Sequence, residues 1–472
     1  MIEAKLFMGS DIEEKPEKGE RRSPYDGRVV SIYPKCDTKD AGNALEVAKE
    51  AFEATKRTPL AQRIAWLEDV ANRIEEEREI FAETITDEIG KPIAFSRVEV
   101  DRCIETIRLT AHALTHLRGE TIPTDATPSG RASTAFWRRV PAGVVVAITP
   151  FNFPLNLAAH KLAPALGAGC SVVLKPTPEA PATGYLLARA FIESRYAVPD
   201  ALSVVYGDAE VGSALVSSDI PRVISFTGSV PVGRIITRMA GIKKVSLELG
   251  GNAATFVEKS ADIAHAAARC AFGAFVNSGQ VCISLQRIYV DGAIYDDFVE
   301  AMAQETRKLK VGSPYDEDTF MGPLIDDEAN DRAMRWVESA VAQGARIVAG
   351  GERVDGIFKP TVMADVTDEM PIVCEEVFAP IVSLVKVDDF DEAVTKMNDS
   401  PYGLQFSIFT NDLKMTREAI ERFECGGIVV NDVPTVRFDI QPYGGMKLSG
   451  IGREGPQFAL EEFTEIQSVV LF

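Results

Sequence analysis

The chain has 472 residues, of which 46% are apolar and 25% are charged, as in ordinary globular proteins. This composition excludes a disordered, coiled-coil or collagen-like chain, and the length suggests about three domains or two large ones. Acidic residues outnumber basic residues by 70 to 50, which gives a formal charge of −20. Because such an acidic surface repels phosphate backbones, we expect no nucleic-acid partner.

Cysteine and histidine show no pattern of a metal site or of a disulfide framework. The seven cysteines are odd in number and form no CxxC pair, and the four histidines show no zinc-ligand spacing. We therefore expect reduced thiols, no bound metal and a cytoplasmic location. The first residues lack the layout of a signal peptide.

One uncharged stretch, residues 140–159, is long enough to be mistaken for a membrane span. It contains Pro141, Pro150 and Pro154, which would interrupt a spanning helix. We predict instead a buried strand, a turn and the start of a helix, and we expect no membrane partner.

The first part of the chain is predicted to be helical and to lead into a ribbon. Apolar residues recur at helical spacing over 41–52, over 63–74 and onward to Ile89, and again over 98–117. Residues 119–139 are rich in Thr, Pro, Ser and Gly and then alternate, which indicates an extended ribbon rather than core.

From residue 140 onward the pattern alternates between strands and helices. The predicted strands are 144–148, 171–174, 202–205 and 222–226, and the predicted helices are 155–166, 182–194 and 211–216. A second series has strands at 245–249, 288–290, 346–348 and 381–385, with helices at 263–275 and 293–308. Repeated strand–helix units predict parallel sheets covered on both faces, so we expect two consecutive α/β domains that meet near 245–255.

Several residues at predicted strand ends have the chemistry of a binding site, because parallel sheets bind ligands at the carboxyl ends of their strands. Gly228, Ser229 and Gly233 follow one strand and open a helix, where backbone N–H groups can hold a phosphate. Lys175 ends another strand, and its ammonium can bind a ribose hydroxyl or a phosphate. A plain strand-to-helix turn and a solvated lysine are the structural alternatives.

Three further residues have the chemistry of an active site. Cys282 follows small residues and glycine, which would present its thiol on a tight turn. Glu248 lies in an apolar strand, where a carboxylate is costly to ionise and suits a general base. Asn152 follows a buried strand, and its carboxamide can stabilise an oxyanion. A buried thiol, a paired or helix-capping carboxylate and an Asx turn are the structural alternatives for the three residues.

Taken together, these signals resemble the NAD(P)-dependent aldehyde dehydrogenase superfamily. The resemblance covers nearly the whole chain in the family's order: TPFNFP at 149–154, VVLKP at 172–176, FTGS at 226–229, ELGG at 248–251, GQVC at 279–282, EEVF at 375–378 and PYGG at 442–445. In motif, the chain is most similar to dehydrogenases of small hydroxyaldehydes such as lactaldehyde and glycolaldehyde.

The resemblance implies an α/β fold with two parallel-sheet, Rossmann-like α/β domains and a small β oligomerisation arm. It assigns residues 1–118 and 140–247 to an NAD(P)-binding domain and residues 248–446 to a catalytic domain. Residues 119–139 and 447–472 would form the arm, which implies a homodimer or a homotetramer.

The resemblance also assigns roles to residues. Cys282 would be the nucleophile, Asn152 and the backbone N–H of Cys282 would form the oxyanion hole, and Glu248 would activate the hydrolytic water. Glu248 favours hydrolysis, because relatives that pass the acyl group to coenzyme A usually lack this glutamate. The expected cofactor-binding residues are Thr149, Phe151, Lys175, Pro178, Glu179, Gly207, Gly228, Ser229, Gly233, Leu249, Glu376 and Phe378, with Lys175 and Glu376 on the two riboses.

The expected cofactor is NAD or NADP. Many NAD-preferring relatives carry a glutamate three residues after the strand-end lysine, whereas this chain has Pro178 there and Glu179 one residue later. Without that charge a 2′-phosphate is less strongly excluded, so both cofactors stay open.

The expected substrate is a small aldehyde, bound by Phe153, His160, Val281, Arg437 and Tyr443. Val281 stands where phosphate-recognising relatives often carry arginine, which argues against a glyceraldehyde 3-phosphate specialist. We favour a hydroxyaldehyde such as lactaldehyde or glycolaldehyde. Arg437 leaves two alternatives open: an anchor for an anionic substrate (succinate semialdehyde, glyceraldehyde 3-phosphate, or a phosphonate or sulfonate aldehyde), or a rim arginine paired with Asp432 or Asp439.

Overall fold

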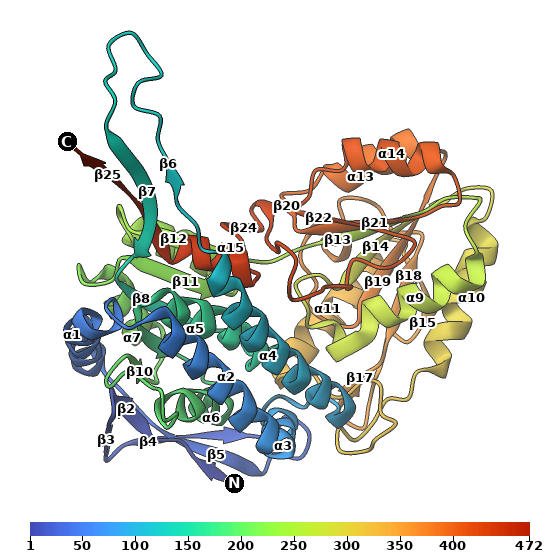
Figure 1. The fold of residues 1–472 in the computed structure, drawn as a ribbon. Coiled ribbons are helices and arrows are strands. Elements are labelled where there is room, and N and C mark those ends of the chain that lie inside the picture. Colours follow the sequence, from blue (N-terminus) through green and yellow to red (C-terminus); the bar gives the residue numbers. More distant parts are fainter.

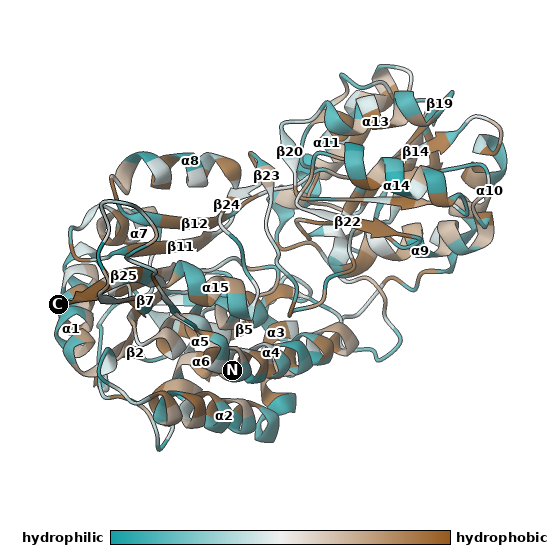
Figure 2. Cartoon of the chain, turned by 45° about the horizontal axis from the view of Figure 1, so that its top comes forward, coloured by the Kyte–Doolittle hydropathy of each residue, from teal (hydrophilic) through white to brown (hydrophobic).

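The chain folds into two α/β bodies and a projecting ribbon (Figure 1). The computed structural model describes residues 1–472. Figure 2 shows the strands of the sheets largely in hydrophobic colours, whereas surface helices such as α2, α10 and α14 alternate between hydrophilic and hydrophobic residues. None of the helices combines the length and the apolar character that crossing a membrane requires.

The first body is built on an eight-stranded sheet. Its strand order is β24-β12-β11-β8-β9-β10-β2-β3. The five central strands pair in parallel, and β24, β2 and β3 add antiparallel edges. The strands are β2 (Leu6–Met8), β3 (Asp11–Glu13), β8 (Val144–Ile148), β9 (Ser171–Lys175), β10 (Leu202–Val204), β11 (Val223–Thr227), β12 (Lys244–Glu248) and β24 (Gly450–Ile451).

Helices cover both faces of this sheet, as expected for buried parallel strands. Apolar side chains of α2 to α6 pack on one face and form the largest core cluster, while α1, α7 and α8 pack on the other. The helices are α1 (Thr38–Thr55), α2 (Leu60–Glu76), α3 (Arg78–Ile89), α4 (Ile93–Ala113), η1 (Leu114–His116), α5 (Asn156–Ala168), α6 (Pro181–Ile192), α7 (Ala209–Ser217), α8 (Val230–Met239) and α15 (Pro456–Glu462).

The second body is built on a seven-stranded sheet, which is parallel except for β15. Its order is β15-β18-β19-β14-β13-β21-β22. The strands are β13 (Ala253–Val257), β14 (Leu285–Asp291), β15 (Arg346–Ala349), β18 (Thr361–Ala364), β19 (Ile381–Val387), β21 (Gln405–Phe409) and β22 (Gly427–Val430). The helices are α9 (Ile263–Phe275), η2 (Val276–Gly279), α10 (Tyr295–Lys308), α11 (Asp327–Ala342), α12 (Pro371–Cys374), α13 (Phe390–Asn398) and α14 (Leu413–Arg422).

The ribbon projects from the first body and is a three-stranded antiparallel sheet (Figure 1). It consists of β6 (Glu120–Thr121), β7 (Thr134–Pro141) and β25 (Thr464–Leu471). Of residues 447–472, only β25 lies in this ribbon, because β24 belongs to the first sheet and α15 packs on α4 and α5. Smaller pairings join β1 (Ile2–Glu3), β4 (Lys18–Arg22) and β5 (Val29–Pro34), β16 (Arg353–Val354) with β17 (Ile357–Phe358), and β20 (Tyr402–Gly403) with β23 (Met446–Lys447).

The predicted α/β fold with parallel sheets is confirmed. The helices and strands predicted between residues 40 and 310 lie within a few residues of their observed bounds. The chain leaves the first sheet after β12 and enters the second at β13. The strands before residue 35 were not predicted from the sequence, and three of the five have only two or three residues, which is too short to show an alternating pattern.

Local sequence signals position the break between α3 and α4. Gly90 ends α3 in the left-handed region with φ of 71°, a conformation that glycine adopts without steric cost. Pro92 then precedes the first residue of α4. The side chain of Lys91 between them is buried and reaches the site described below.

Candidate active site

Two cavities meet at Cys282, between the two bodies. One has a volume of 310 Å³ and is lined mainly by residues of α4, α5, α9 and the segment after β22. The other has a volume of 550 Å³ and lies at the carboxyl ends of β8, β11 and β12. Cys282 lines both cavities, so its sulfur lies where two different molecules can approach each other.

A strained turn presents the thiol of Cys282. Asn277, Ser278 and Gly279 have consecutive positive φ values of 52°, 55° and 69°. A Cβ on Gly279 would lie 2.3 Å from the carbonyl oxygen of Ala379, so only glycine fits there. Non-glycine residues in the left-handed region store strain, which is typical of functional turns.

The two glycines after Glu248 allow close approach of site groups. A Cβ on Gly250 would lie 2.2 Å from the Glu376 carboxylate, and a Cβ on Gly251 would lie 2.2 Å from the carbonyl oxygen of Cys282. The backbone N–H of Gly251 donates to Glu376 Oε1 over 2.9 Å. The ELGG segment therefore packs directly against the nucleophile's backbone and the Glu376 side chain.

Asn152 is held beside the Cys282 turn by hydrogen bonds. Its Nδ2 donates to the carbonyl oxygen of Gln280 over 2.9 Å, and Nδ2 of Asn277 donates to the carbonyl oxygen of Asn152 over 3.1 Å. Asn152 and Cys282 line the same 550 Å³ cavity. The carboxamide is thus fixed close to the carbon that a Cys282 thiolate would attack.

Burial sets the electrostatics of Cys282. The Sγ atom lies 2.9 Å from the hydroxyl oxygen of Tyr443. Burial raises the pKa of the Cys282 thiol to about 12, and the Tyr443 hydrogen bond and the positive charge of Arg437 oppose that rise. The carboxyl groups of Glu376 and Glu248 raise this pKa further.

Glu248 ends β12 and lies in the second cavity. Only 3% of the residue is exposed, and neither carboxylate oxygen has a hydrogen-bond partner. Burial, with the charge of Glu454 as the next cause, raises the pKa of Glu248 well above its usual range. A neutral carboxyl with free oxygens is suited to exchange a proton with water.

The 550 Å³ cavity contains most of the residues that the sequence predicts for cofactor binding. These are Thr149, Phe151, Glu179, Gly228, Ser229, Leu249, Glu376 and Phe378. Parallel pairing aligns the strand ends, since Ile148 lies opposite Lys175 and Thr227 opposite Glu248. Gly228 and Ser229 precede α8, whose first N–H groups suit a phosphate.

The other four predicted cofactor residues lie outside the cavity lining. Gly233 allows α8 to pack on Leu249, because a Cβ there would lie 2.6 Å from that side chain. Lys175 is buried at the end of β9, and burial lowers its pKa while the charge of Glu179 raises it. Gly207 packs against Val211 with φ of 157°. Pro178 is half-buried next to Glu179.

The 310 Å³ cavity contains four of the five predicted substrate residues: Phe153, Val281, Arg437 and Tyr443. The fifth, His160, does not line it. His160 is 1% exposed and bonds to Asp439 over 3.0 Å and to Arg437 over 3.2 Å. It therefore supports the cavity wall from behind.

The predicted alternative of a rim arginine paired with Asp432 or Asp439 is wrong. The Arg437 side chain is only 7% exposed, and its guanidinium pairs with Glu454 over 3.1 Å. Asp432 pairs with Arg269, and Asp439 accepts two hydrogen bonds from Arg102. The Nε of Arg437 is buried without a partner.

Sequence reasoning missed the charged residues that α4 and the preceding turn bring to this cavity. Lys91, Glu99 and Arg102 line it, and the ammonium of Lys91 pairs with Glu99 and lies 3.8 Å from the ring centre of Phe153. Glu99 Oε1 also accepts the backbone N–H of Leu155 over 2.9 Å. Charged residues on a helix usually face solvent, so no pattern distinguishes these. The only signal was the Gly-Lys-Pro interruption itself.

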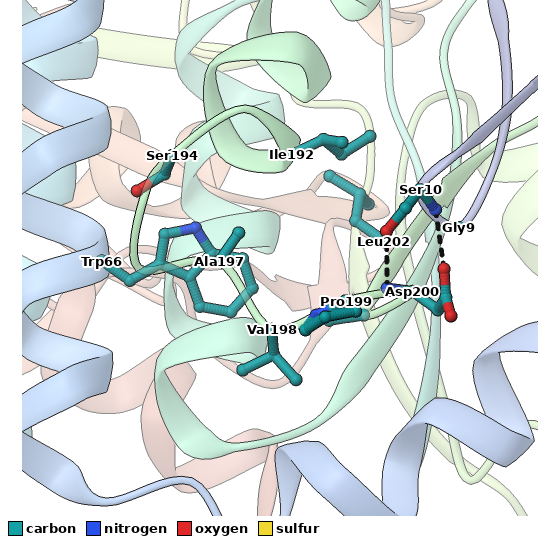
Figure 3. A pocket seen from close by; sticks show the side chains of 11 residues that line it. Gly9, Ser10, Trp66, Ile192, Ser194, Ala197, Val198, Pro199, Asp200 and Leu202 are labelled. Carbon is teal, nitrogen blue, oxygen red and sulfur yellow. Dashed lines mark hydrogen bonds between the residues drawn. The ribbon is translucent and has the colours of Figure 1, made fainter.

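A separate hollow of 160 Å³ lies among the β2–β3 hairpin, α2 and the end of α6 (Figure 3). Its polar groups satisfy one another, since Ser10 and Asp200 exchange two hydrogen bonds, and Trp66 Nε1 donates to the carbonyl oxygen of Phe191 over 2.9 Å. The cavities at Cys282 differ from this hollow, because they are lined by buried polar atoms without partners, such as the carboxylate oxygens of Glu248 and Nε of Arg437.

Comparisons with known proteins agree with this geometry. A model of the family described as "Aldehyde dehydrogenase family" matches residues 12–469. The chain is 42% identical over 99% of its length to 3-sulfolactaldehyde dehydrogenase of Priestia aryabhattai, covering 97% of that protein. It is 36% identical over 96% of its length to lactaldehyde dehydrogenase of Methanococcus aeolicus, covering 97% of that protein.

A solved structure is similar along nearly the whole chain. Glyceraldehyde-3-phosphate dehydrogenase GapN of Methanocaldococcus jannaschii, complexed with NADP, superposes with a TM-score of 0.93 at 37% identity. The match covers 97% of this chain and 99% of that one. The chain therefore belongs to the aldehyde dehydrogenase family and is an NAD(P)-dependent aldehyde dehydrogenase.

Proposed function

We propose that this enzyme oxidises a small hydroxyaldehyde, such as lactaldehyde or glycolaldehyde, to its carboxylic acid. The observation that carries the proposal is the position of Cys282 at the junction of a 310 Å³ cavity and a 550 Å³ cavity. The smaller cavity suits a compact substrate, and the larger cavity suits NAD or NADP. The similarity to lactaldehyde dehydrogenase supports this substrate class.

In this mechanism the Cys282 thiolate attacks the aldehyde carbon and forms a thiohemiacetal. The Asn152 carboxamide and the backbone N–H of Cys282 stabilise the oxyanion that develops. Bound NAD(P) supplies the acceptor for the hydride that leaves the same carbon. Lys175 and Glu376 hold the riboses, and Phe378 packs beside the nicotinamide ribose.

Hydrolysis of the resulting thioester is the task of Glu248. Its carboxylate takes a proton from a water molecule, which attacks the thioester carbon and expels the Cys282 thiolate. Burial raises the pKa of Glu248 and so favours its protonated form, and the carboxyl acts as a base once it has lost that proton. The neighbouring cations Arg437, Lys161 and Arg453 lower its pKa and favour that loss.

A second candidate is a hydroxyaldehyde that carries an anionic group. Three basic side chains line the substrate cavity: Lys91, Arg102 and Arg437. With Lys161, the surrounding buried network holds four basic groups against three paired carboxylates, those of Glu99, Asp439 and Glu454. Burial raises the pKa of Glu248 and lowers that of His160, which favours the neutral form of each, and the four basic groups then exceed the three carboxylates by one. The relative named 3-sulfolactaldehyde dehydrogenase supports this candidate.

The test compares kcat/KM for lactaldehyde, glycolaldehyde, succinate semialdehyde, glyceraldehyde 3-phosphate and sulfolactaldehyde, each with NAD and with NADP. The proposal expects the neutral hydroxyaldehydes to be the best substrates. Preference for an anionic aldehyde, lost in Arg437→Lys because lysine lacks the bidentate fork, would establish the second candidate instead. Lys386→Arg, on an exposed side chain of β19, is the matched control.

We also propose that the ribbon pairs subunits into a homodimer or a homotetramer in the cytoplasm. The apolar side chains of Ile466, Val470, Leu471 and Phe472 are exposed on β25 and beyond it, which supports a protein partner there. Sedimentation of the full chain and of a chain that ends before β25 tests the assembly, and the proposal expects only the full chain to associate.

A further inference from the structure

The hydroxyl of Tyr443 is the polar group closest to the nucleophile. Its oxygen lies 2.9 Å from Cys282 Sγ, and the tyrosine is only 3% exposed. A thiol and a phenol can each donate in this pair, but a thiolate has no proton to donate. Once Cys282 is ionised, the hydrogen bond can therefore run in one direction only, from the Tyr443 O–H to the sulfur.

Arg437 fixes the ring that carries this hydroxyl. The guanidinium carbon lies 3.7 Å from the ring centre of Tyr443, a close cation–π contact. Arg437 is itself held by Glu454 and His160, over 3.1 Å and 3.2 Å. A buried positive charge beside a phenol favours loss of the phenol proton and so strengthens its O–H as a hydrogen-bond donor.

The charges around Cys282 otherwise oppose its ionisation. Glu376 and Glu248 face the sulfur and raise its pKa, and burial raises it most. Arg437 and Tyr443 are the two groups that lower it. The contact with Tyr443 is the only one of these that touches the sulfur directly.

We propose that Tyr443 is a catalytic residue whose hydroxyl donates a hydrogen bond to the Cys282 thiolate, with Arg437 as the positioning residue for its ring. The hydrogen bond stabilises the sulfur twice: when the thiolate forms before attack, and when it leaves the thioester during hydrolysis. No proton is transferred to or from Tyr443 in either step. The inference rests on the proposed reaction through Cys282.

The test measures alkylation of Cys282 by iodoacetamide from pH 6 to pH 10.5, without aldehyde, by mass spectrometry of the peptide that contains it. Alkylation requires the thiolate, so its rate follows the thiol pKa. Tyr443→Phe is expected to move the profile to higher pH by about one unit, which lowers the rate at pH 8 about tenfold. Tyr295→Phe, which removes another buried hydroxyl at 3.4 Å from the Leu384 carbonyl oxygen, is expected to leave the profile unchanged.

An unchanged profile in Tyr443→Phe would overturn the inference. The alkylation assay uses no aldehyde, so its result does not depend on the substrate. If no aldehyde were oxidised, the proposed function would be contradicted, but the alkylation profile of Tyr443→Phe would still test the hydrogen bond. The hydrolysis step is checked separately, since Tyr443→Phe should also slow steady-state turnover after the first NADH is formed.

The role of Arg437 is tested by a double-mutant cycle. Arg437→Met is expected to lower the alkylation rate at pH 8 about threefold, and to cause a smaller loss in Tyr443→Phe, where only the direct effect of the Arg437 charge on the sulfur remains. Equal losses in both backgrounds would show that Arg437 acts directly and would overturn its positioning role. If Arg437→Met does not fold, Arg437→Lys replaces it in the cycle. Lysine keeps the positive charge beside Glu454 but lacks the planar guanidinium that stacks on the Tyr443 ring.

Discussion

Glu248 and Glu454 lie in one buried cluster and have opposite pKa shifts. Glu454 pairs with Lys161 and Arg437 over 3.1 Å each, and these cations lower its pKa to about 2. Glu248 has no hydrogen-bond partner, and its pKa is raised by burial and by the charge of Glu454. The cluster thus favours the ionised form of Glu454 and the protonated form of Glu248, which fits the proposed role of Glu248 in proton transfer.

The first prediction concerns hydrolysis. Glu248→Gln should preserve the formation of one equivalent of NADH per subunit and slow the steady state about 10²- to 10⁴-fold, because water attacks the thioester without a base. Stopped-flow absorbance at 340 nm separates the two phases. Glu421→Gln, on the exposed end of α14, is the control and should behave as wild type. A burst lost together with the steady state would contradict the assignment of Glu248 to hydrolysis alone.

The second prediction concerns pH. Because the charge of Glu454 raises the pKa of Glu248, Glu454→Gln should lower that pKa and move the acidic limb of thioester hydrolysis to lower pH. Single-turnover rates from pH 5 to pH 9 measure the shift, and an acidic limb that stays in place would contradict it.

The same substitution should also reduce stability. The pKa of Glu454 is depressed in the folded protein, so its stabilising contribution is present above the unfolded value near 4.5 and is lost as pH falls toward 2. Glu454→Gln leaves Lys161 and Arg437 without their counter-ion, which costs about 3–5 kcal/mol of the free energy of unfolding at neutral pH. Denaturant unfolding at pH 7 measures this loss, which should shrink toward pH 3.

The third prediction concerns the cofactor. Glu179 lines the cofactor cavity and accepts a hydrogen bond from the hydroxyl of Thr177, so its charge lies close to the expected adenosine ribose. Glu179→Gln should raise kcat/KM for NADP relative to NAD about five- to tenfold, because a repulsive charge near the 2′-phosphate is removed. Glu13→Gln, in the exposed strand β3, controls for overall charge. A ratio that does not move would place the ribose away from Glu179.

The fourth prediction concerns packing at the nucleophile. Gly251→Ala places a methyl group 2.2 Å from the Cys282 carbonyl oxygen, so the backbone between β12 and β13 must shift, at a cost of about 1–3 kcal/mol and most of the activity. Gly42→Ala in α1, where a Cβ meets no atom within 4 Å, should instead stabilise the protein by about 0.5–1 kcal/mol. Thermal unfolding and turnover measured on both variants distinguish local clash from a general effect of added methyl groups.

The sequence alone was enough to predict the α/β fold and the candidate active site around Cys282. Residues 144–148 and 172–174 are uninterrupted apolar runs, and such runs are typical of buried parallel strands, so these strands could be predicted from the sequence. Cys282, Glu248 and Asn152 were predicted because they lie in family motifs: Cys282 follows a glycine turn, Glu248 ends a strand and Asn152 follows a strand. Parallel pairing brings the strand ends to one edge. These signals are local in sequence.

The charged residues around the Cys282 sulfur could be identified only from the tertiary structure. Lys91 lies just before α4, Glu99 and Arg102 lie in α4, and Glu454 comes from the far end of the chain, so no local pattern links them to Cys282. In a sequence, the two residues of a buried ion pair cannot be distinguished from two surface charges. For this reason the sequence suggested Asp432 or Asp439 as alternative partners of Arg437, and His160 was expected in the cavity lining. Periodicity reports which residues are apolar, whereas the partner of a buried charge is fixed by contacts between distant segments.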